Sequence, residues 1–314
     1  MSKNIKNLLL FISIFFVLGE CFVRLRNSVA DIPELTIDEQ GIQKYQPNQK
    51  GYFKGGTHRW NINELGWSGF LPESNDNLIT IIGDSFIENF MNPSECHQSV
   101  LLKNKLPDYN FFEAGRSGVS FIEAMEIAKQ LDSLSPIQNL IYVSDNDFKE
   151  SIYEVTPHAN ITQYSIKKDS ILYGTIKSPV LKKILYNWKL MFYLYSQYPI
   201  DQIINKKLPN TNNNLVQSKS ATNDSNFYNQ LSELLNFIKN KYDLNKTTLI
   251  FRPDSDKKII AISVKNGFKV IVLNSDNDKS WSFRNDHHWT CYGHQKAAEQ
   301  IYMATKNQNI VKIN

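Results

Sequence analysis

The sequence has little that would point to a metal protein or to a nucleic-acid-binding protein. It contains 3 cysteines and 6 histidines in 314 residues, and no Cys/His cluster has the spacing of zinc ligands. His287, His288 and His294 lie too close together along the chain to form a metal site. The formal net charge of +4 is small and dispersed, which argues against a nucleic-acid surface. We therefore expect no metal, no organic cofactor and no nucleic-acid partner.

Long apolar runs are also scarce. Hydrophobic residues make up 41% of the chain, an ordinary fraction that excludes a disordered chain and a polytopic membrane protein. The exception lies at the N-terminus, where Lys3 and Lys6 precede the apolar run Leu8–Leu18. This run is short for a membrane span and suits a signal-peptide core. Because the residues around Gly19 make a poor cleavage site, residues 1–26 are interpreted as an uncleaved signal anchor, with a cleaved signal peptide as the alternative.

Either interpretation places the rest of the chain outside the cytoplasm, as a membrane-anchored periplasmic or extracellular domain or, alternatively, as a secreted one.

Strand-like and helical patterns alternate in two parts of the chain, residues 78–148 and 226–314. In the first part we predict strands at 78–82, 109–113 and 139–144 and helices at about 86–105 and 119–132. In the second part we predict helices at 227–242 and 295–305 and strands at 247–251 and 269–273. Such alternation predicts an α/β fold, with a parallel sheet covered by helices on both faces.

Residues 27–77, before the first strand, contain few periodic segments and several turn signals. They predict an N-terminal strap, in part a β-ribbon, that lies against the domain. Trp60 and Trp67 fall in this segment. Stacking against a sugar is one interpretation of these side chains, and packing inside the protein is the preferred one.

Residues 149–225 interrupt the α/β alternation and are interpreted as an insertion. Ser178–Tyr198 has helical periodicity, with Pro179 well placed at a first turn. This segment predicts a helical cap over the site. The alternative is a membrane-touching helix whose lysines flank the headgroup layer, namely Lys182, Lys183 and Lys189. The polar stretch from Thr211 to Ser225 predicts a mobile loop.

The residues that point to chemistry follow the first predicted strand. Gly83 permits a sharp turn there, so that Ser85 stands at the carboxyl end of a central strand and beside a helix N-terminus. Open α/β sheets place their sites at this position. A serine is a poor nucleophile unless a base removes its proton. His288 is the candidate base and Asp286 the candidate group that orients it, as in a Ser-His-Asp triad.

At these residues the chain resembles the SGNH (GDSL) hydrolase family. The resemblance extends over four blocks in the family's order, namely Gly83–Ser85, Glu113–Gly118, Ser144–Asp147 and Asp286–Trp289. The last block has the Asp-x-His-Trp form, which is similar to the branch containing polysaccharide O-acetyltransferases and their relatives. The resemblance implies a flavodoxin-like three-layer α/β/α fold around a central parallel sheet.

The resemblance also implies which groups stabilise a developing oxyanion. They are the backbone amides of Ser85 and Gly118 and the side chain of Asn146, with Gly115 as the main competitor for Gly118. In the third block Ser144 stands where many family members have glycine.

Four further residues near these blocks receive structural predictions. Asp84 and Asp147 are expected to brace loops, because the triad already supplies an acid. Cys96 and Cys291 are expected near one edge of the site, where an oxidising compartment would allow a disulfide. Two free buried thiols are the alternative.

Together, the motifs and the resemblance imply a serine esterase that hydrolyses O-acyl esters, with acetyl esters on a cell-surface glycan as the preferred substrate. One alternative is an O-acetyltransferase that uses the same residues on a surface polysaccharide. The other is a non-catalytic glycan-binding or assembly protein on the same scaffold. The implied partners are an acylated carbohydrate or another small ester, and a membrane through the N-terminal segment.

Overall fold

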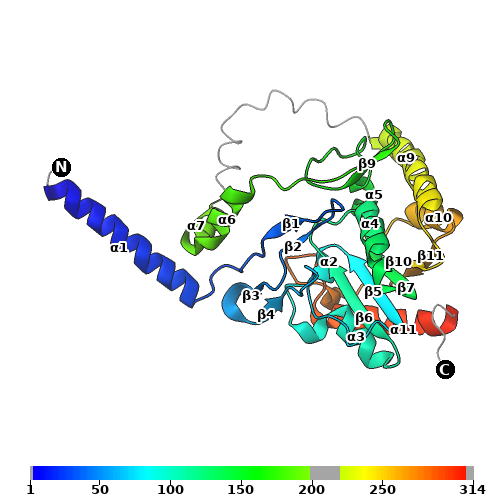
Figure 1. Cartoon of the computed structure of the whole chain (residues 1–314), viewed down its shortest axis with the longest axis horizontal. Coiled ribbons are helices and arrows are strands. Elements are labelled where there is room, and N and C mark those ends of the chain that lie inside the picture. The colour runs from blue at the N-terminus through cyan, green and yellow to red at the C-terminus, as the bar shows by residue number, and fades with distance from the viewer. Residues whose placement is uncertain (1–2, 199–219, 309–314) are drawn as a thin grey trace. The chain divides into compact units, whose positions relative to one another are not determined.

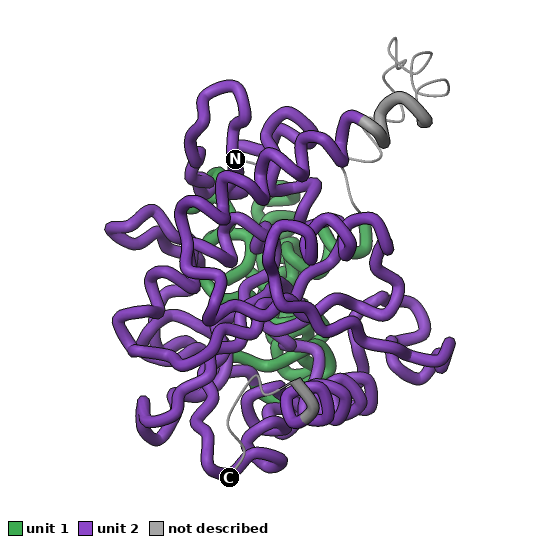
Figure 2. Tube along the Cα trace, turned by 90° about the vertical axis from the view of Figure 1, so that its right-hand side faces the viewer, with its two compact units in different colours: residues 1–34, 50–59, 177–220 green, residues 35–49, 60–176, 221–314 purple. Residues whose placement is uncertain are grey.

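The computed structural model describes residues 3–198 and 220–308. The chain divides into two compact units (Figure 2). Unit 1 comprises residues 1–34, 50–59 and 177–220, and unit 2 comprises residues 35–49, 60–176 and 221–314.

Unit 2 is built on a five-stranded sheet in which all paired strands are parallel (Figure 1). Its strand order is β11-β10-β7-β5-β6. The strands are β5 (Leu78–Gly83), β6 (Asn110–Gly115), β7 (Gln138–Val143), β10 (Thr247–Phe251) and β11 (Lys269–Val272). Every residue of the central strands β5, β7 and β10 is buried, as expected for strands covered on both faces. The predicted parallel sheet is confirmed.

Helices cover both faces of this sheet, because side chains in a strand point alternately to opposite sides. On one face Ile82 packs in a core with α4 (Phe121–Leu131) and α9 (Ser220–Lys241). On the other face Ile81 packs in a core with α3 (Gln98–Lys105) and α11 (Cys291–Gln308). The unit is therefore a three-layer α/β/α fold.

The continuous helix predicted over about 86–105 is wrong. Its place is taken by α2 (Ser85–Glu88), the 3-10 helix η2 (Ser94–Cys96) and α3. Asn89 ends α2 with a φ of 52°, a left-handed conformation that asparagine tolerates better than most residues. Pro93 precedes η2 in an extended conformation. This break creates a short connection between α2 and α3, on which part of the site depends.

Helix α10 (Lys257–Lys265) has no counterpart among the predicted elements. Asp256 caps it by accepting a hydrogen bond from the backbone amide of Lys258 at 2.7 Å. The remaining elements of unit 2 are short: β1 (Leu35–Ile37) and β2 (Gln43–Tyr45), which pair antiparallel, η3 (Asp132–Leu134), α5 (Asp145–Glu150), β8 (Gln163–Ser165) and β9 (Ser170–Leu172), also antiparallel, and η5 (Lys279–Trp281).

The predicted strap, residues 27–77, contains the β-ribbon that was expected, formed by β1 and β2. It also carries β3 (Lys50–Tyr52), η1 (Lys54–Gly56) and β4 (Arg59–Asn61). Trp60 and Trp67 are buried, with 6% and 1% of their surfaces exposed. They therefore pack inside the protein and do not offer a stacking surface to a sugar.

Unit 1 contains α1 (Lys3–Leu25), α6 (Pro179–Asn187) and α7 (Lys189–Gln197). By length and composition α1 could cross a membrane: the mean hydropathy of its most apolar 18-residue window is 2.3, and 6% of that window is buried. The helix is longer than the apolar run Leu8–Leu18, since it continues through Gly19 as far as Leu25.

The insertion predicted at 149–225 belongs partly to each unit. Residues 177–198 pack with α1 in unit 1, and the cap over the site stays a prediction. Of the predicted mobile loop, residues 211–219 lie outside the described residues. The prediction is wrong for residues 220–225, which form the first turns of α9, because its polar N-terminal residues extend the amphipathic helix that follows.

Candidate active site

Ser85 is the first residue of α2 and follows β5 through a tight turn. The side chain of Asp84 accepts a hydrogen bond from the backbone amide of Phe86 at 3.0 Å and so caps α2. A Cβ atom on Gly83 would lie 2.7 Å from Cγ1 of Ile87, so only glycine lets α2 fold back against the strand. The turn therefore holds the Ser85 hydroxyl at the carboxyl edge of the sheet.

The structure brings Ser85, His288 and Asp286 together, although 203 positions in the chain separate Ser85 from His288. Nε2 of His288 lies 2.7 Å from Oγ of Ser85, and Nδ1 of His288 lies 2.5 Å from Oδ1 of Asp286. The same carboxylate oxygen accepts a hydrogen bond from the backbone amide of His288 at 3.0 Å. It is thus His288, and not the exposed His287, that reaches the serine.

The charge of Asp286 determines the tautomer of His288. Burial acts to raise the pKa of Asp286, but the hydrogen bonds from the amide and imidazole of His288 outweigh it and hold the pKa below its usual range. The carboxylate therefore stays ionised and accepts the Nδ1 proton, which leaves Nε2 free to accept a proton from Ser85. The side chains of His288 and Asp286 are 26% and 45% exposed.

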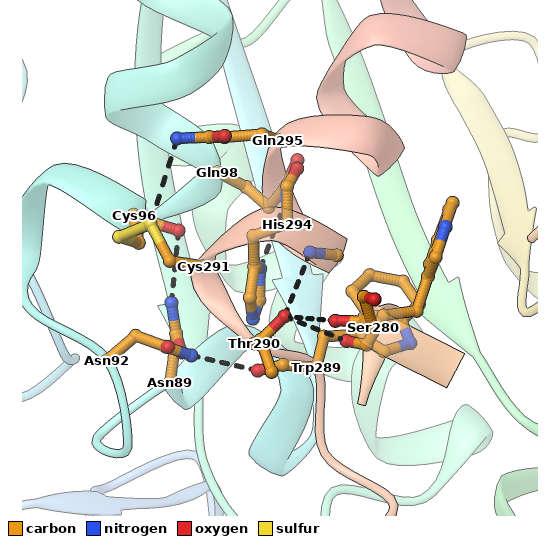
Figure 3. The surroundings of a disulfide bond; sticks show 12 residues. Asn89, Asn92, Cys96, Gln98, Ser280, Trp289, Thr290, Cys291, His294 and Gln295 are labelled. Carbon is orange, nitrogen blue, oxygen red and sulfur yellow. Dashed lines mark hydrogen bonds between the residues drawn. A yellow bond between two sulfur atoms is a disulfide. The ribbon is translucent and has the colours of Figure 1, made fainter. Parts of the chain in front are cut away.

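The segment after His288 is fastened to the short connection between α2 and α3 (Figure 3). Trp289 is buried, and its ring packs edge-on against Phe86 with the centroids 5.2 Å apart. The side-chain amide of Asn92 donates a hydrogen bond to the carbonyl of Trp289 at 2.9 Å. These contacts tie the residue after the candidate base to the residues around the candidate nucleophile.

A disulfide joins the same two segments. Cys96 of η2 is bonded to Cys291 at the start of α11, with their Cα atoms 5.2 Å apart (Figure 3). Of the two alternatives that the sequence left open, a disulfide or two free thiols, the structure has the disulfide. Next to it the side-chain amide of Gln98 contacts Nδ1 of His294 at 3.1 Å and donates to its carbonyl at 2.9 Å. Burial, with His97 and His288 nearby, lowers the pKa of His294 to about 3, so His294 is neutral and packs the base of the loop.

The two candidate oxyanion residues beyond Ser85 follow the strands that flank β5. Gly118 follows β6 and Asn146 lies in the first turn of α5 after β7, so the parallel strands bring both to the same sheet edge as Ser85. Both residues are exposed. Gly118 has a φ of 76° with open space where a Cβ would lie. A Cβ on the competitor Gly115 would lie 2.4 Å from the backbone nitrogen of Glu88, so Gly115 serves packing.

A buried network that the sequence analysis did not identify holds the loop before Gly118. The carboxylate of Glu88 accepts hydrogen bonds from the backbone amide and the hydroxyl of Ser117, both at 2.7 Å. It also accepts a hydrogen bond from the hydroxyl of Tyr45. Burial raises the pKa of Glu88, although these hydrogen bonds act in the opposite direction. The sequence feature that could have indicated this network is Glu88 itself, a carboxylate on the buried face of the helix that begins at Ser85.

Arg116 completes this network from the other side. Its guanidinium donates to the carbonyl of Gln43 at 3.0 Å and to the carboxylate of Glu123 at 2.8 Å. Because Gln43 and Tyr45 belong to β2, the strap anchors the loop that carries Gly118.

Asp84 and Asp147 brace loops, as expected. Asp147 accepts a hydrogen bond from the backbone amide of Ser144 at 2.6 Å and forms a capping box with it at the start of α5. Burial, and then the nearby Asp84, raise the pKa of Asp147 well above its usual range. Ser144 is thus a helix cap.

Among residues 3–198 and 220–308, no group of three or more His, Cys, Asp or Glu side chains could hold a metal ion.

No family model matches the sequence, and no curated protein matches it. Several solved structures are similar in fold. The psychrotrophic esterase EstA from Pseudoalteromonas sp. is 13% identical, with a TM-score of 0.40 over 74% of this chain and 99% of the other. TesA is 9% identical, with a TM-score of 0.40 over 74% and 99%. A lipolytic protein of the G-D-S-L family from Veillonella parvula is 11% identical, with a TM-score of 0.34 over 73% and 98%. At these values the likeness does not carry an activity over to this chain.

Proposed function

We propose that this protein is a serine esterase of the SGNH type that hydrolyses O-acyl esters. The observation that carries the proposal is the continuous chain of contacts from Asp286 through His288 to Ser85, at 2.5 and 2.7 Å. These residues lie at the carboxyl edge of a parallel sheet, beside an exposed glycine and an exposed asparagine that can donate hydrogen bonds.

The geometry supports a two-step reaction. Nε2 of His288 takes the proton of Ser85 as Oγ attacks the ester carbonyl, and the amides of Ser85 and Gly118 with the side chain of Asn146 bind the oxyanion. The C–O bond to the leaving alcohol then breaks, and His288 returns the proton to that alcohol. A water molecule, deprotonated in turn by His288, attacks the acyl-serine. The bond between the acyl carbon and Oγ breaks, His288 returns the proton to Ser85, and the carboxylic acid is released.

For the substrate we propose acetyl esters on a cell-surface glycan. The support is the Asp-x-His-Trp form of the last block, which resembles the branch that contains polysaccharide O-acetyltransferases. A location outside the cytoplasm is supported by the disulfide Cys96–Cys291, since such bonds persist in oxidising compartments. It is also supported by α1, which is long and apolar enough to act as an anchor.

Hydrolysis is preferred over acetyl transfer to a sugar because of the exposure of the site. His288 and Asp286 are 26% and 45% exposed, so water can reach an acyl group on Ser85. A transferase has to keep water from its acyl-enzyme.

The test uses the full chain in detergent with p-nitrophenyl acetate, with and without surface glycan from the source cells. We expect Ser85→Ala to abolish nitrophenol release, a loss of about 10⁴-fold or more, and the exposed Ser133→Ala to leave it unchanged. Deacetylation of the glycan, followed by mass spectrometry, would support the substrate proposed. Acetyl groups appearing on the glycan would identify a transferase. Release that does not depend on Ser85 would contradict the proposal.

A further inference from the structure

Helices α6 and α7 present an apolar surface that unit 1 leaves exposed. Val180 is 70% exposed, Leu181 67% and Ile184 57%. At helical spacing these three side chains share one face of α6. Trp188, at the junction with α7, is 43% exposed and lies on the continuation of that face. Four large apolar residues side by side on one face mark a surface that meets another apolar phase.

These helices are attached to α1 by an acidic residue inside an otherwise apolar helix. The carboxylate of Glu20 accepts hydrogen bonds from the backbone amides of Lys189 at 3.1 Å and Leu190 at 2.7 Å. It thereby caps the N-terminus of α7. Arg24, one turn further along α1, pairs with the same carboxylate at 2.6 Å. These contacts account for a carboxylate in a helix that has the composition of a membrane span.

The packing at this point is close. A Cβ atom on Gly19 would lie 2.9 Å from Cδ2 of Leu190, and Leu190 itself is 6% exposed. The guanidinium of Arg24 also donates to the carbonyl of Asn187 at 2.5 Å. Helices α6 and α7 are therefore packed against the C-terminal end of α1.

The position of this attachment along α1 indicates where a membrane surface would lie. At about 1.5 Å per residue, the 23 residues of α1 extend about 35 Å, and Glu20 stands about 25 Å from Lys3. The hydrocarbon core of a bilayer is about 30 Å thick. With α1 across a bilayer, Glu20 and α7 lie near the boundary between hydrocarbon and headgroups.

We infer that α6 and α7 form a second membrane contact, which lies in the bilayer interface with Val180, Leu181 and Ile184 in the acyl-chain region. A tryptophan at the junction of the two helices suits this depth, because indole rings gather at the boundary between lipid and water. The occupant of the apolar face is thus lipid, because Trp188 at the end of this face packs on Phe16 of α1, with ring centroids 6.0 Å apart. Helix α1 itself has the length and composition of a membrane span.

The lysines have a different arrangement from the one the sequence suggested. Lys189 does not flank a headgroup layer: it is 8% exposed, pairs with Asp31 at 2.7 Å and donates to the carbonyl of Ala30 at 3.2 Å. Lys183 pairs with Glu34 at 3.0 Å. Lys182, on the face of α6 opposite Ile184, remains in a position to reach headgroups.

This inference does not depend on the proposed function, and spin labels test it directly. The full chain carrying Cys21→Ser is reconstituted in vesicles of phosphatidylcholine and phosphatidylglycerol, with a nitroxide on Ile184→Cys or, as the matched control, on Lys182→Cys. We expect oxygen to relax the label at 184 several-fold more effectively than a water-soluble nickel complex does, and the reverse order at 182. Adding Glu20→Leu should increase the mobility of the label at 184.

Three results would overturn the inference. A label at 184 that the nickel complex reaches as readily as the label at 182 would mean an aqueous surface. A label that neither reagent reaches would mean a protein partner. Dipolar broadening at 184 that disappears on dilution with unlabelled chains would mean contact with a second copy.

Discussion

The two sides of the candidate site are held in place by different means. Ser85 sits on the turn between a fully buried strand and the helix α2, and its position depends on neighbours within four residues in the chain, Gly83, Asp84 and Ile87. His288 sits on a loop without regular structure. Its position depends on residues almost 200 positions away, through Asn92 and Cys96.

The site thus combines local positioning of the nucleophile with tertiary positioning of the base. The nucleophile needs no long-range contact to face the sheet edge, because strand, turn and helix together determine its direction. The base has no such element, so buried side chains and a covalent bond replace it. We therefore expect the base side to be the more sensitive to distant changes, while loss of a reacting group on either side abolishes catalysis.

The largest effect on the base side should come from His288→Gln, which removes the proton acceptor of Ser85 but keeps the bulk of the side chain. We expect the rate of ester hydrolysis to fall about 10⁴-fold. The adjacent His287→Gln is the matched control and should change the rate by less than about twofold, because His287 is exposed. Steady-state kinetics on p-nitrophenyl acetate measure both rates, and equal losses in the two variants would contradict the assignment of His288 as the base.

The next effect should come from Asp286→Asn, which removes the charge that selects the tautomer of His288. We expect kcat to fall roughly a hundredfold with little change in KM, because the interaction matters most when His288 carries a proton. Asn285→Ala is the control, since it changes the exposed neighbouring residue on the same loop but removes no charge. A larger loss for Asn285→Ala than for Asp286→Asn would show that the wrong residue has been paired with His288.

Removal of the disulfide tests the long-range clamp itself. Cys96→Ser with Cys291→Ser should lower the free energy of unfolding by roughly 3–5 kcal/mol, because the bond closes a very long loop. It should also reduce kcat about tenfold, since the loop of His288 loses one of its fastenings. Cys21→Ser, at an exposed cysteine in α1, should do neither. Thermal unfolding and kinetics on the same samples measure both quantities, and unchanged values would mean that packing of Trp289 suffices.

The smallest effect concerns a buried ion pair between His97, which precedes α3, and Glu113 of β6. Nδ1 of His97 lies 2.7 Å from Oε2 of Glu113. Burial acts to lower the pKa of His97, but the Glu113 carboxylate outweighs it and raises the pKa. The pair therefore adds stability that is fully present below the unfolded pKa of His97 and is lost as pH rises through the folded pKa. Between pH 6 and pH 9 the free energy of unfolding should fall more for the wild type than for His97→Gln, as measured by thermal unfolding. Equal losses in the two proteins would contradict a stabilising pair that weakens as pH rises.

Much of the fold and the three central residues of the site could be predicted from the sequence. The buried strands are recognisable in the sequence as apolar runs such as 78–82, and Ser85 follows that run after Gly83 and Asp84. The pairing of His288 with Asp286 was also predictable, because both lie in one short block.

What could not be predicted depends on contacts that are distant in the chain. The break at Asn89 replaced a predicted continuous helix, and it needs the tertiary fold to be favourable. The role of Glu88 arises only when Tyr45 and Ser117 meet around it. The packing of α7 on Glu20 likewise joins positions about 170 residues apart.

A fluorophosphonate probe, which reacts with activated serines, measures whether His288 activates Ser85. The full chain is labelled in detergent, and the modified peptide is located by mass spectrometry for the wild type, His288→Gln and His287→Gln. Activation by His288 predicts one adduct, on Ser85, that forms at similar rates in the wild type and His287→Gln and at a rate lower by several orders of magnitude in His288→Gln. An unlabelled Ser85, or equal labelling in all three proteins, would contradict it.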